Sequence, residues 1–174
     1  IRLPRISNFS DFSILEALSG VDLIYADSPQ GLEDADIIII PGTKSTIIDL
    51  QWLKRRGIGN AVIRAARSGI PVIGICGGYQ MLGRSIADPD GVEGPAESVE
   101  GLGLLAVDTV LGGDKALAEV RGTANGAAFE GYEIHLGRTS GRDTARPAVR
   151  FEDGRTDGAV SADIVDRADA ARYQ

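Results

Sequence analysis

The chain has 174 residues with 25 acidic and 18 basic side chains, which gives a formal net charge of −7 at pH 7. This acidic balance argues against a nucleic-acid partner, because phosphate contacts need clustered Lys and Arg. A single cysteine and a single histidine exclude an internal disulfide and argue against a metal site of the usual zinc type. No apolar run approaches membrane-spanning length, so we predict a globular protein without membrane contact. The single cysteine is consistent with a reducing compartment, and we predict a cytoplasmic location.

The first half of the chain alternates strand-like and helix-like segments. The clearest strand is 35–43, whose run "IIII" is typical of a parallel strand buried on both faces. A helix follows over 46–57, with Ser45 or Thr46 as its cap and Gly57 at its end. The other predicted elements are strands at 1–7, 20–28 and 72–75 and helices at 10–18 and 60–69. This alternation predicts an α/β fold, an open and mostly parallel flavodoxin-like sheet with helices on both faces.

The second half of the chain differs from the first in composition and in its predicted secondary structure. Residues 87–101 are rich in Gly, Pro and acidic residues and are predicted to form an exposed loop. Strands are expected over 102–111 and 129–140, as an extension of the sheet, and a further polar loop over 140–148. Because we find no internal repeat and no convincing boundary, we predict a single domain over 1–174.

The only cysteine lies in "VIGICGGYQ" (72–80), where a short strand runs into Cys76 and a helix follows at once. A nucleophile on a sharp strand-to-helix turn has this arrangement, and small neighbours such as Gly74, Gly77 and Gly78 avoid clashes there. A helix N-terminus favours the thiolate and offers N–H groups to an oxyanion. A cysteine after an apolar strand is usually a small buried hydrophobe, so the local pattern leaves both interpretations open.

A second glycine-containing turn follows the strand 35–43. Pro41, Gly42 and Thr43 come at its carboxyl end, the edge at which open α/β sheets bind ligands. Gly42 would let the backbone approach a ligand closely; the alternative is an ordinary loop that leads to a Ser45 cap. A Walker phosphate loop does not fit, because the glycine spacing before Lys44 is wrong.

Three motifs together carry a family resemblance: "PGTKSTIIDLQWL" (41–53), "GICGGYQMLG" (74–83) and "GYEIHLGRT" (131–139). The chain closely resembles the C-terminal glutamine amidotransferase domain of the cobyric acid synthase family, a branch of the class I (triad) amidotransferases. The resemblance extends from "RLPRISNFSDF" (2–12) to "DGAVSAD" (157–163). The first two motifs are shared with relatives that amidate other acids, and the third points to the cobyric acid branch.

The resemblance implies a glutaminase in cobalamin biosynthesis. The domain would hydrolyse glutamine to glutamate and ammonia, with Cys76 as the nucleophile that forms a glutamyl thioester. The positions that match oxyanion and glutamine binding are Gly42, Thr43, Gly77, Gly78 and Gln80. Among them, Gly42 and the backbone of Gly77 match the oxyanion positions, and Gln80 lines the glutamine pocket.

The resemblance also implies a partner. An N-terminal synthetase domain or subunit that uses ATP and Mg would activate carboxylates of a corrinoid acceptor, adenosylcobyrinic acid a,c-diamide. Ammonia from this domain would convert four of them to amides. No cofactor is expected in this domain, whose own ligand would be glutamine. Tyr132 and Arg138, in the third motif, are expected on the acceptor side.

A cysteine nucleophile needs a base, normally a histidine, and the only one here is His135. On a strand, Glu133 and His135 share a face, so spacing alone allows a triad of Cys76, His135 and Glu133. The resemblance instead implies that the catalytic histidine belongs to a later motif, roughly G-T-Y-L-H-G, after residue 163, and gives His135 a separate role.

That later motif is absent from the sequence, and two explanations compete. Either a segment is missing between about Asp163 and Ile164, or the protein lacks the base and is impaired or inactive. We favour the first, because an otherwise intact motif set has little reason to persist beside a lost base. A chain break after Asp163 would support it, and a continuous backbone there would contradict it.

Two other functions remain open from the sequence. One is a cysteine hydrolase or deglycase on a similar sheet, which would keep the turn at Cys76 and change the chemistry. The other is a catalytically inactive docking module that binds glutamine or a synthetase partner. Glutamine hydrolysis that depends on Cys76 separates the leading hypothesis from both.

Overall fold

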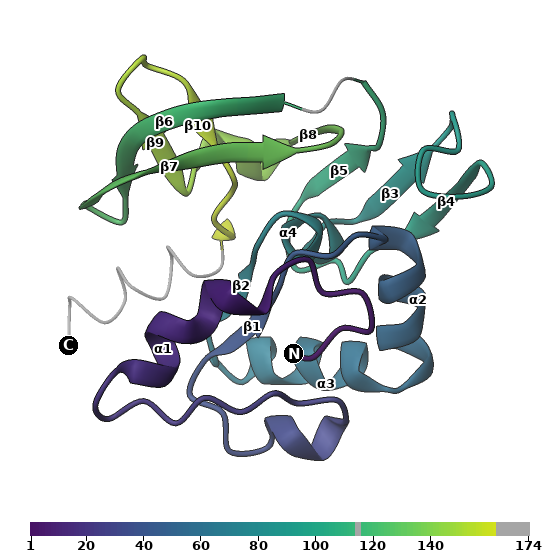
Figure 1. Cartoon of the computed structure of the whole chain (residues 1–174). Coiled ribbons are helices and arrows are strands. Elements are labelled where there is room, and N and C mark those ends of the chain that lie inside the picture. The colour runs from purple at the N-terminus through teal and green to yellow at the C-terminus, as the bar shows by residue number, and fades with distance from the viewer. Residues whose placement is uncertain (114–115, 163–174) are drawn as a thin grey trace. The chain divides into compact units, whose positions relative to one another are not determined.

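A computed structural model of the chain describes residues 1–113 and 116–162 (Figure 1). It divides into two compact units, one formed by Ile1–Leu82 and one that begins at Gly83. The boundary falls directly after the helix that follows Cys76. The prediction of one domain over 1–174 stays a prediction.

The first unit is built around two short parallel strands that lie side by side (Figure 1). They are β1 (Ile38–Ile40) and β2 (Val72–Gly74), with Ile38 opposite Val72. The helices of this unit are α1 (Ser13–Ala17), α2 (Thr46–Arg55), α3 (Ile58–Arg67) and α4 (Gly77–Leu82), with 3₁₀ turns at Phe9–Phe12 and Pro29–Leu32.

The core of this unit joins β1 to the inner faces of three helices. Its fully buried side chains include Ile38, Ile40, Leu50, Leu53, Ile58, Val62 and Met81. The helices α2 and α3 pack against each other, and α4 packs on both α2 and β2. Gly57, with φ 75°, makes the break between α2 and α3, a backbone conformation that glycine adopts without strain.

Several predicted elements of this unit are confirmed. Both long helices, the strand inside 35–43 and the strand before Cys76 are present, and Ser45 is the residue before α2. Residues 1–7 and 20–28 are not strands. Ile6 forms an isolated antiparallel bridge with Thr43, and the Arg2 N–H donates to the Ala26 carbonyl at 2.8 Å, but single bonds of this kind do not make a ladder.

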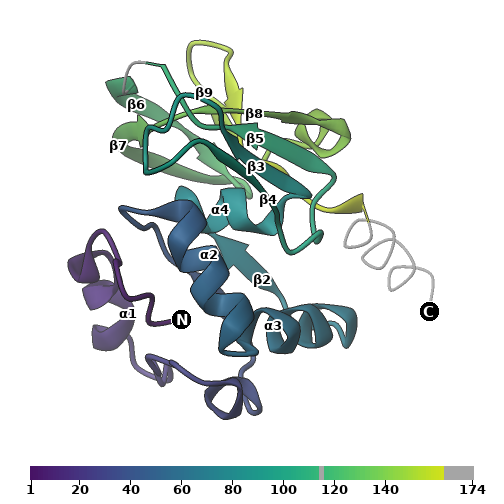
Figure 2. The ribbon, with the colours of Figure 1, turned by 90° about the vertical axis from the view of Figure 1, so that its right-hand side faces the viewer.

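Over its described residues, the second unit forms two four-stranded sheets. The first has the order β4-β3-β5-β8 and the second the order β10-β9-β6-β7; in Figure 2 the strands β4, β3 and β5 lie next to one another. Their bounds are β3 (Ser85–Asp88), β4 (Glu97–Glu100), β5 (Val107–Val110), β6 (Ala116–Ala124), β7 (Ala127–His135), β8 (Arg138–Gly141), β9 (Val149–Phe151) and β10 (Thr156–Asp157), with a 3₁₀ turn at Arg142–Ala145.

This second unit differs in detail from the sequence-based expectation. Its strand pairs in the described ranges are antiparallel except for β3 with β5. The predicted loop 87–101 contains β4, which pairs with β3 through Ile86 and Val99. The hairpin of β6 and β7 turns at Asn125 and Gly126, with φ 49° and 80°, the two positive angles that a tight hairpin turn requires.

The longest helices in the described ranges, α2 and α3, have ten residues each. No helix in this part of the chain is therefore long and apolar enough to cross a bilayer. The location of the protein in the cell stays a prediction.

Candidate active site

Cys76 lies between the end of β2 and the start of α4, with its side chain exposed. Its φ of 51° is in the left-handed region, which a residue with a Cβ rarely adopts and which costs on the order of 1–3 kcal/mol. The predicted sharp strand-to-helix turn is therefore present, and the alternative of a buried structural cysteine is wrong. Whether the thiol acts as a nucleophile stays a prediction.

The glycines around Cys76 are required by close backbone approach. A Cβ on Gly78 would lie 2.0 Å from the Ile40 carbonyl oxygen, and one on Gly74 would lie 2.6 Å from the Gly78 oxygen. A Cβ on Gly77 would lie 2.9 Å from the Thr43 methyl carbon. The turn can therefore pack against β1 and the loop that follows it only because these three positions have no side chain.

The loop Pro41–Lys44 lies against the same turn. A Cβ built on Gly42 would be 3.6 Å from the Cβ of Cys76, so the two residues are neighbours, as their places at adjacent strand ends predict. The loop is also tied to the N-terminal segment, since the Ser7 N–H donates to the Gly42 carbonyl at 2.9 Å and the Lys44 N–H to the Arg5 carbonyl at 3.0 Å.

Two backbone donors remain available beside the thiol. Within residues 1–113 and 116–162, neither the Gly42 N–H nor the Gly77 N–H donates to a protein acceptor. The Gly78 N–H, by contrast, donates to the Ile75 carbonyl at 2.9 Å. Of the glycines predicted to bind an oxyanion, Gly42 and Gly77 therefore have the free donors that such a site needs.

Asp49 and Arg5 are residues that the sequence analysis missed. The side chain of Asp49 is completely buried, and it accepts hydrogen bonds from the Thr43 hydroxyl at 2.6 Å and from the Arg5 Nη1 at 3.1 Å. A signal existed: Thr46, Asp49 and Leu53 share the buried face of α2, and an acidic residue on an apolar helix face needs a partner.

Gln80 is buried rather than open to solvent, with 6% of its surface exposed. It lies on the inner side of α4, where the Thr46 hydroxyl donates to its Oε1 at 3.5 Å, and its N–H donates to the Cys76 carbonyl at 3.1 Å. Gln80 therefore joins α4 to the first turn of α2. Its predicted role in lining a glutamine pocket stays a prediction.

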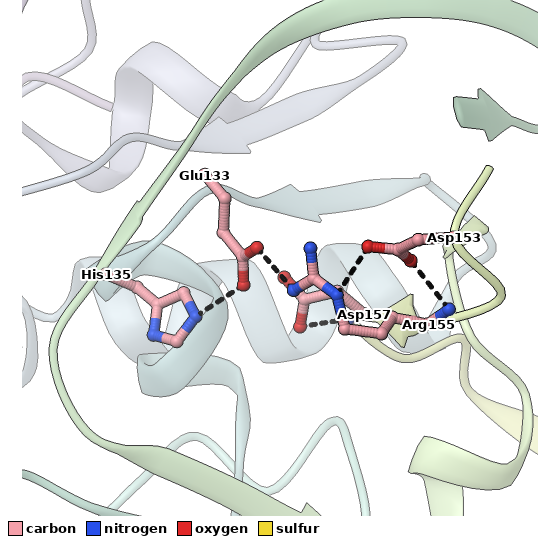
Figure 3. A network of polar contacts seen from close by, with 6 residues as sticks. Glu133, His135, Asp153, Arg155 and Asp157 are labelled. Atoms are coloured by element: carbon pink, nitrogen blue, oxygen red, sulfur yellow. Dashed lines mark hydrogen bonds and ion pairs between the residues drawn. The ribbon is translucent and has the colours of Figure 1, made fainter. Parts of the chain in front are cut away.

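The predicted pair of Glu133 and His135 is present in the second unit. Both side chains lie on the less exposed face of β7, with the Glu133 Oε1 3.1 Å from the His135 Nε2. In Figure 3 the Arg155 guanidinium lies between Glu133 and Asp153 and donates to them at 2.7 and 2.8 Å. The hydrogen bond from Arg155, joined by that to His135, holds the pKa of Glu133 below its usual value.

Cys76 belongs to the other unit, and a triad with His135 and Glu133 stays a prediction. Glu133, His135 and Asp157 also offer ligand atoms within 4.8 Å of one another, but Arg155 already holds one oxygen of Glu133, and a cation next to the carboxylate opposes metal binding.

The two residues expected on the acceptor side are exposed. Tyr132 donates its hydroxyl to Glu119 Oε1 at 3.2 Å, across the pairing of β6 and β7. Arg138 begins β8 opposite Val110. Their predicted role stays a prediction. The alternatives of a missing segment or a lost base concern the chain after Asp163, which lies outside the described residues.

A family model described as the CobB/CobQ-like glutamine amidotransferase domain matches residues 1–167. The chain belongs to this family. The predicted resemblance is therefore confirmed at the level of this family. The chain is 49% identical to the cobyric acid synthase of Mycobacterium ulcerans over 160 residues. This match covers 92% of this chain and 32% of that protein.

Other comparisons agree with this assignment. The chain is 52% identical over 161 residues to the cobyric acid synthase of Novosphingobium aromaticivorans, with 92% of this chain and 33% of that protein covered. A solved glutamine amidotransferase matches with a TM-score of 0.59 at 20% identity, over 83% of this chain and 75% of that one, which confirms the predicted α/β fold of a glutamine amidotransferase. Among the described residues only β1 with β2 and β3 with β5 pair in parallel, so the sheets are mixed rather than mostly parallel. The chain spans about a third of the length of these curated relatives.

Proposed function

We propose that this chain hydrolyses glutamine to glutamate and ammonia, with Cys76 as the nucleophile. The observation that carries the proposal is the exposed thiol on a left-handed turn, with Gly42 packed beside it. An exposed cysteine adds no apolar burial to the core that could offset the backbone strain. Strained residues of this kind are typical of reactive sites.

The chemistry follows from the groups around the turn. The thiolate attacks the carboxamide carbon of glutamine, and the Gly42 and Gly77 N–H groups stabilise the negative charge that develops on its oxygen. The C–N bond then breaks, ammonia leaves with the proton that the histidine base took from the Cys76 thiol, and a thioester to Cys76 remains. Water adds to the thioester and releases glutamate and the thiol.

We further propose that the ammonia serves cobyric acid synthesis. The relatives that match at about half identity are cobyric acid synthases about three times as long. A synthetase region with ATP and Mg would activate the carboxylates of adenosylcobyrinic acid a,c-diamide, and ammonia would convert them to amides. In that scheme this chain binds glutamine and requires no cofactor of its own.

The test is glutamate release by the protein expressed from its complete natural coding sequence, with and without ATP, Mg and the corrinoid acceptor. Cys76→Ala is expected to lower kcat by at least about 10³-fold, because the covalent route is lost. Ser98→Ala, an exposed change in β4, is the matched control and is expected to leave kcat unchanged.

Other outcomes would contradict the proposal. Glutamine binding without turnover by the intact protein would favour the inactive docking module. Hydrolysis of other substrates by Cys76, with no glutamate released from glutamine, would favour a cysteine hydrolase. Equal glutamate release by Cys76→Ala would exclude the thiol as the nucleophile.

A further inference from the structure

The most completely buried carboxylate of the first unit lies close to the proposed oxyanion donors. Asp49 is in the middle of α2, yet its two oxygens accept hydrogen bonds from residues outside that helix. Oδ2 accepts from the Thr43 hydroxyl at 2.6 Å and from the Arg5 N–H at 3.2 Å, and Oδ1 accepts from the Arg5 Nη1 at 3.1 Å. A charge without access to water requires such partners.

Thr43 is the link between this carboxylate and the turn at Cys76. Its hydroxyl also lies 3.0 Å from the Arg5 carbonyl, but the shorter contact to a charged oxygen is the stronger one. Its methyl carbon lies 2.9 Å, and its backbone nitrogen 3.5 Å, from the position that a Cβ on Gly77 would take. Thr43 thus packs against Gly77 and is joined to Gly42 by the peptide bond.

We propose that Asp49 is a positioning residue for glutamine hydrolysis. By fixing the Thr43 hydroxyl, it sets the spacing between the Gly42 N–H and the Gly77 N–H, the two donors proposed to hold the oxyanion. This inference rests on the proposed function and deepens it. Removal of one oxyanion donor lowers kcat by about 10²–10³-fold, so displacement of the pair lowers kcat by at least about tenfold.

A purely structural role makes a different prediction. A buried carboxylate with several donors stabilises the fold wherever it lies, and its loss then lowers stability without a specific effect on chemistry. Asp88 provides the comparison, because it is also buried and accepts hydrogen bonds from the N–H groups of Val92 and Glu93, both at 2.8 Å. Asp88→Asn therefore shows how far the loss of a buried carboxylate charge lowers stability and kcat at a position outside the proposed site.

The experiment uses the protein from its complete natural coding sequence and compares Thr43→Val, Thr43→Ser, Asp49→Asn and Asp88→Asn. Thr43→Val keeps the shape and removes the hydroxyl. We expect Thr43→Val and Asp49→Asn to lower kcat for glutamine by about 10–100-fold, with KM within about threefold of wild type. Thr43→Ser keeps the hydroxyl and recovers most of the kcat that Thr43→Val loses.

A second measurement separates the oxyanion donors from the thiol. Alkylation of Cys76 by iodoacetamide displaces iodide from a saturated carbon, and no oxyanion forms. We therefore expect its rate in Thr43→Val to stay within about twofold of wild type while kcat falls, because the thiolate is retained and only oxyanion stabilisation is weakened. Asp88→Asn is expected to lower the melting temperature and to leave kcat unchanged.

Each other result overturns the inference. Unchanged kcat in Thr43→Val, with only a lower melting temperature, would give Asp49 a structural role. If the alkylation rate and kcat fell by the same factor in Thr43→Val, the Asp49–Thr43 pair would act on the Cys76 thiol rather than on the oxyanion donors. If Asp49→Asn does not fold, Thr43→Val decides alone. Failure of the wild-type protein to release glutamate would refute the proposed function and this inference with it, whereas an active wild type with active variants refutes this inference only.

Discussion

Gly78 is the position at which the packing of the Cys76 turn can be tested most directly. A Cβ there would lie 2.0 Å from the Ile40 carbonyl oxygen and 2.8 Å from the Pro41 oxygen. The first distance is about 1 Å shorter than the 3.0 Å below which real Cβ contacts are essentially not found. Both obstacles are backbone atoms, so no side-chain rotation can relieve the clash.

The expected cost of Gly78→Ala follows from this geometry. The Ile40 carbonyl also accepts the Ile75 N–H at 3.0 Å, so moving it away from Gly78 weakens the bond that joins the end of β2 to β1. Overpacking in a core costs about 1–3 kcal/mol and a lost hydrogen bond roughly 1 kcal/mol. We expect a destabilisation of about 3 kcal/mol, which lowers the melting temperature by roughly 6–12 °C.

The assay is thermal unfolding followed by circular dichroism, with Gly94→Ala as the matched control. Gly94 is exposed, has nothing within 4 Å of its Cβ position and does not adopt a positive φ. Its substitution is expected to change stability by no more than about 0.5 kcal/mol. Equal melting temperatures for Gly78→Ala and Gly94→Ala would refute the close approach of α4 to β1.

Two further predictions concern Cys76 and Glu133. Because Cys76 has a left-handed φ, Cys76→Gly is expected to be more stable than Cys76→Ala by about 1 kcal/mol, measured by denaturant unfolding; the opposite order would argue against the strained turn. Glu133 has a lowered pKa because Arg155 and His135 donate to it, so its contribution is present above the unfolded-state pKa and is lost as the pH falls through the folded-state pKa. Glu133→Gln is therefore expected to cost about 1 kcal/mol or less at neutral pH, since Arg155 is half exposed, and to match wild type at acidic pH; parallel pH curves for the two proteins would contradict this.

The sequence analysis predicted those features that depend on residues close together in the sequence. The turn at Cys76 is encoded by an apolar strand that runs into closely spaced glycines, and both α2 and the strand before it follow from local apolar patterns. Likewise, the alternation of β7 places Glu133 and His135 on one face, which needs no knowledge of the partner strand. The family resemblance came from three motifs taken together, and none of these local patterns supplies it alone.

The features that the sequence did not predict depend on contacts between distant residues. The strand β4 is acidic and exposed, and only its pairing with β3 makes it a strand. The segments 1–7 and 20–28 have apolar residues but lack a partner strand along their length. The bond from Thr43 to Asp49 required the helix α2 to be placed against the loop before it, because nothing in the sequence of the loop indicates its partner.

The exposed thiol depends on a turn that backbone groups hold in place. The Ile75 N–H donates to the Ile40 carbonyl and the Gly78 N–H to the Ile75 carbonyl, at 3.0 and 2.9 Å, and Cys76 lies between these two bonds. Together they contribute roughly 2 kcal/mol, comparable to the cost of a left-handed residue. Since neither bond uses the Cys76 side chain, the turn itself would be satisfied best by glycine. Burial in the core therefore does not explain a cysteine at this position, because the exposed side chain contributes no apolar burial in return for the backbone strain.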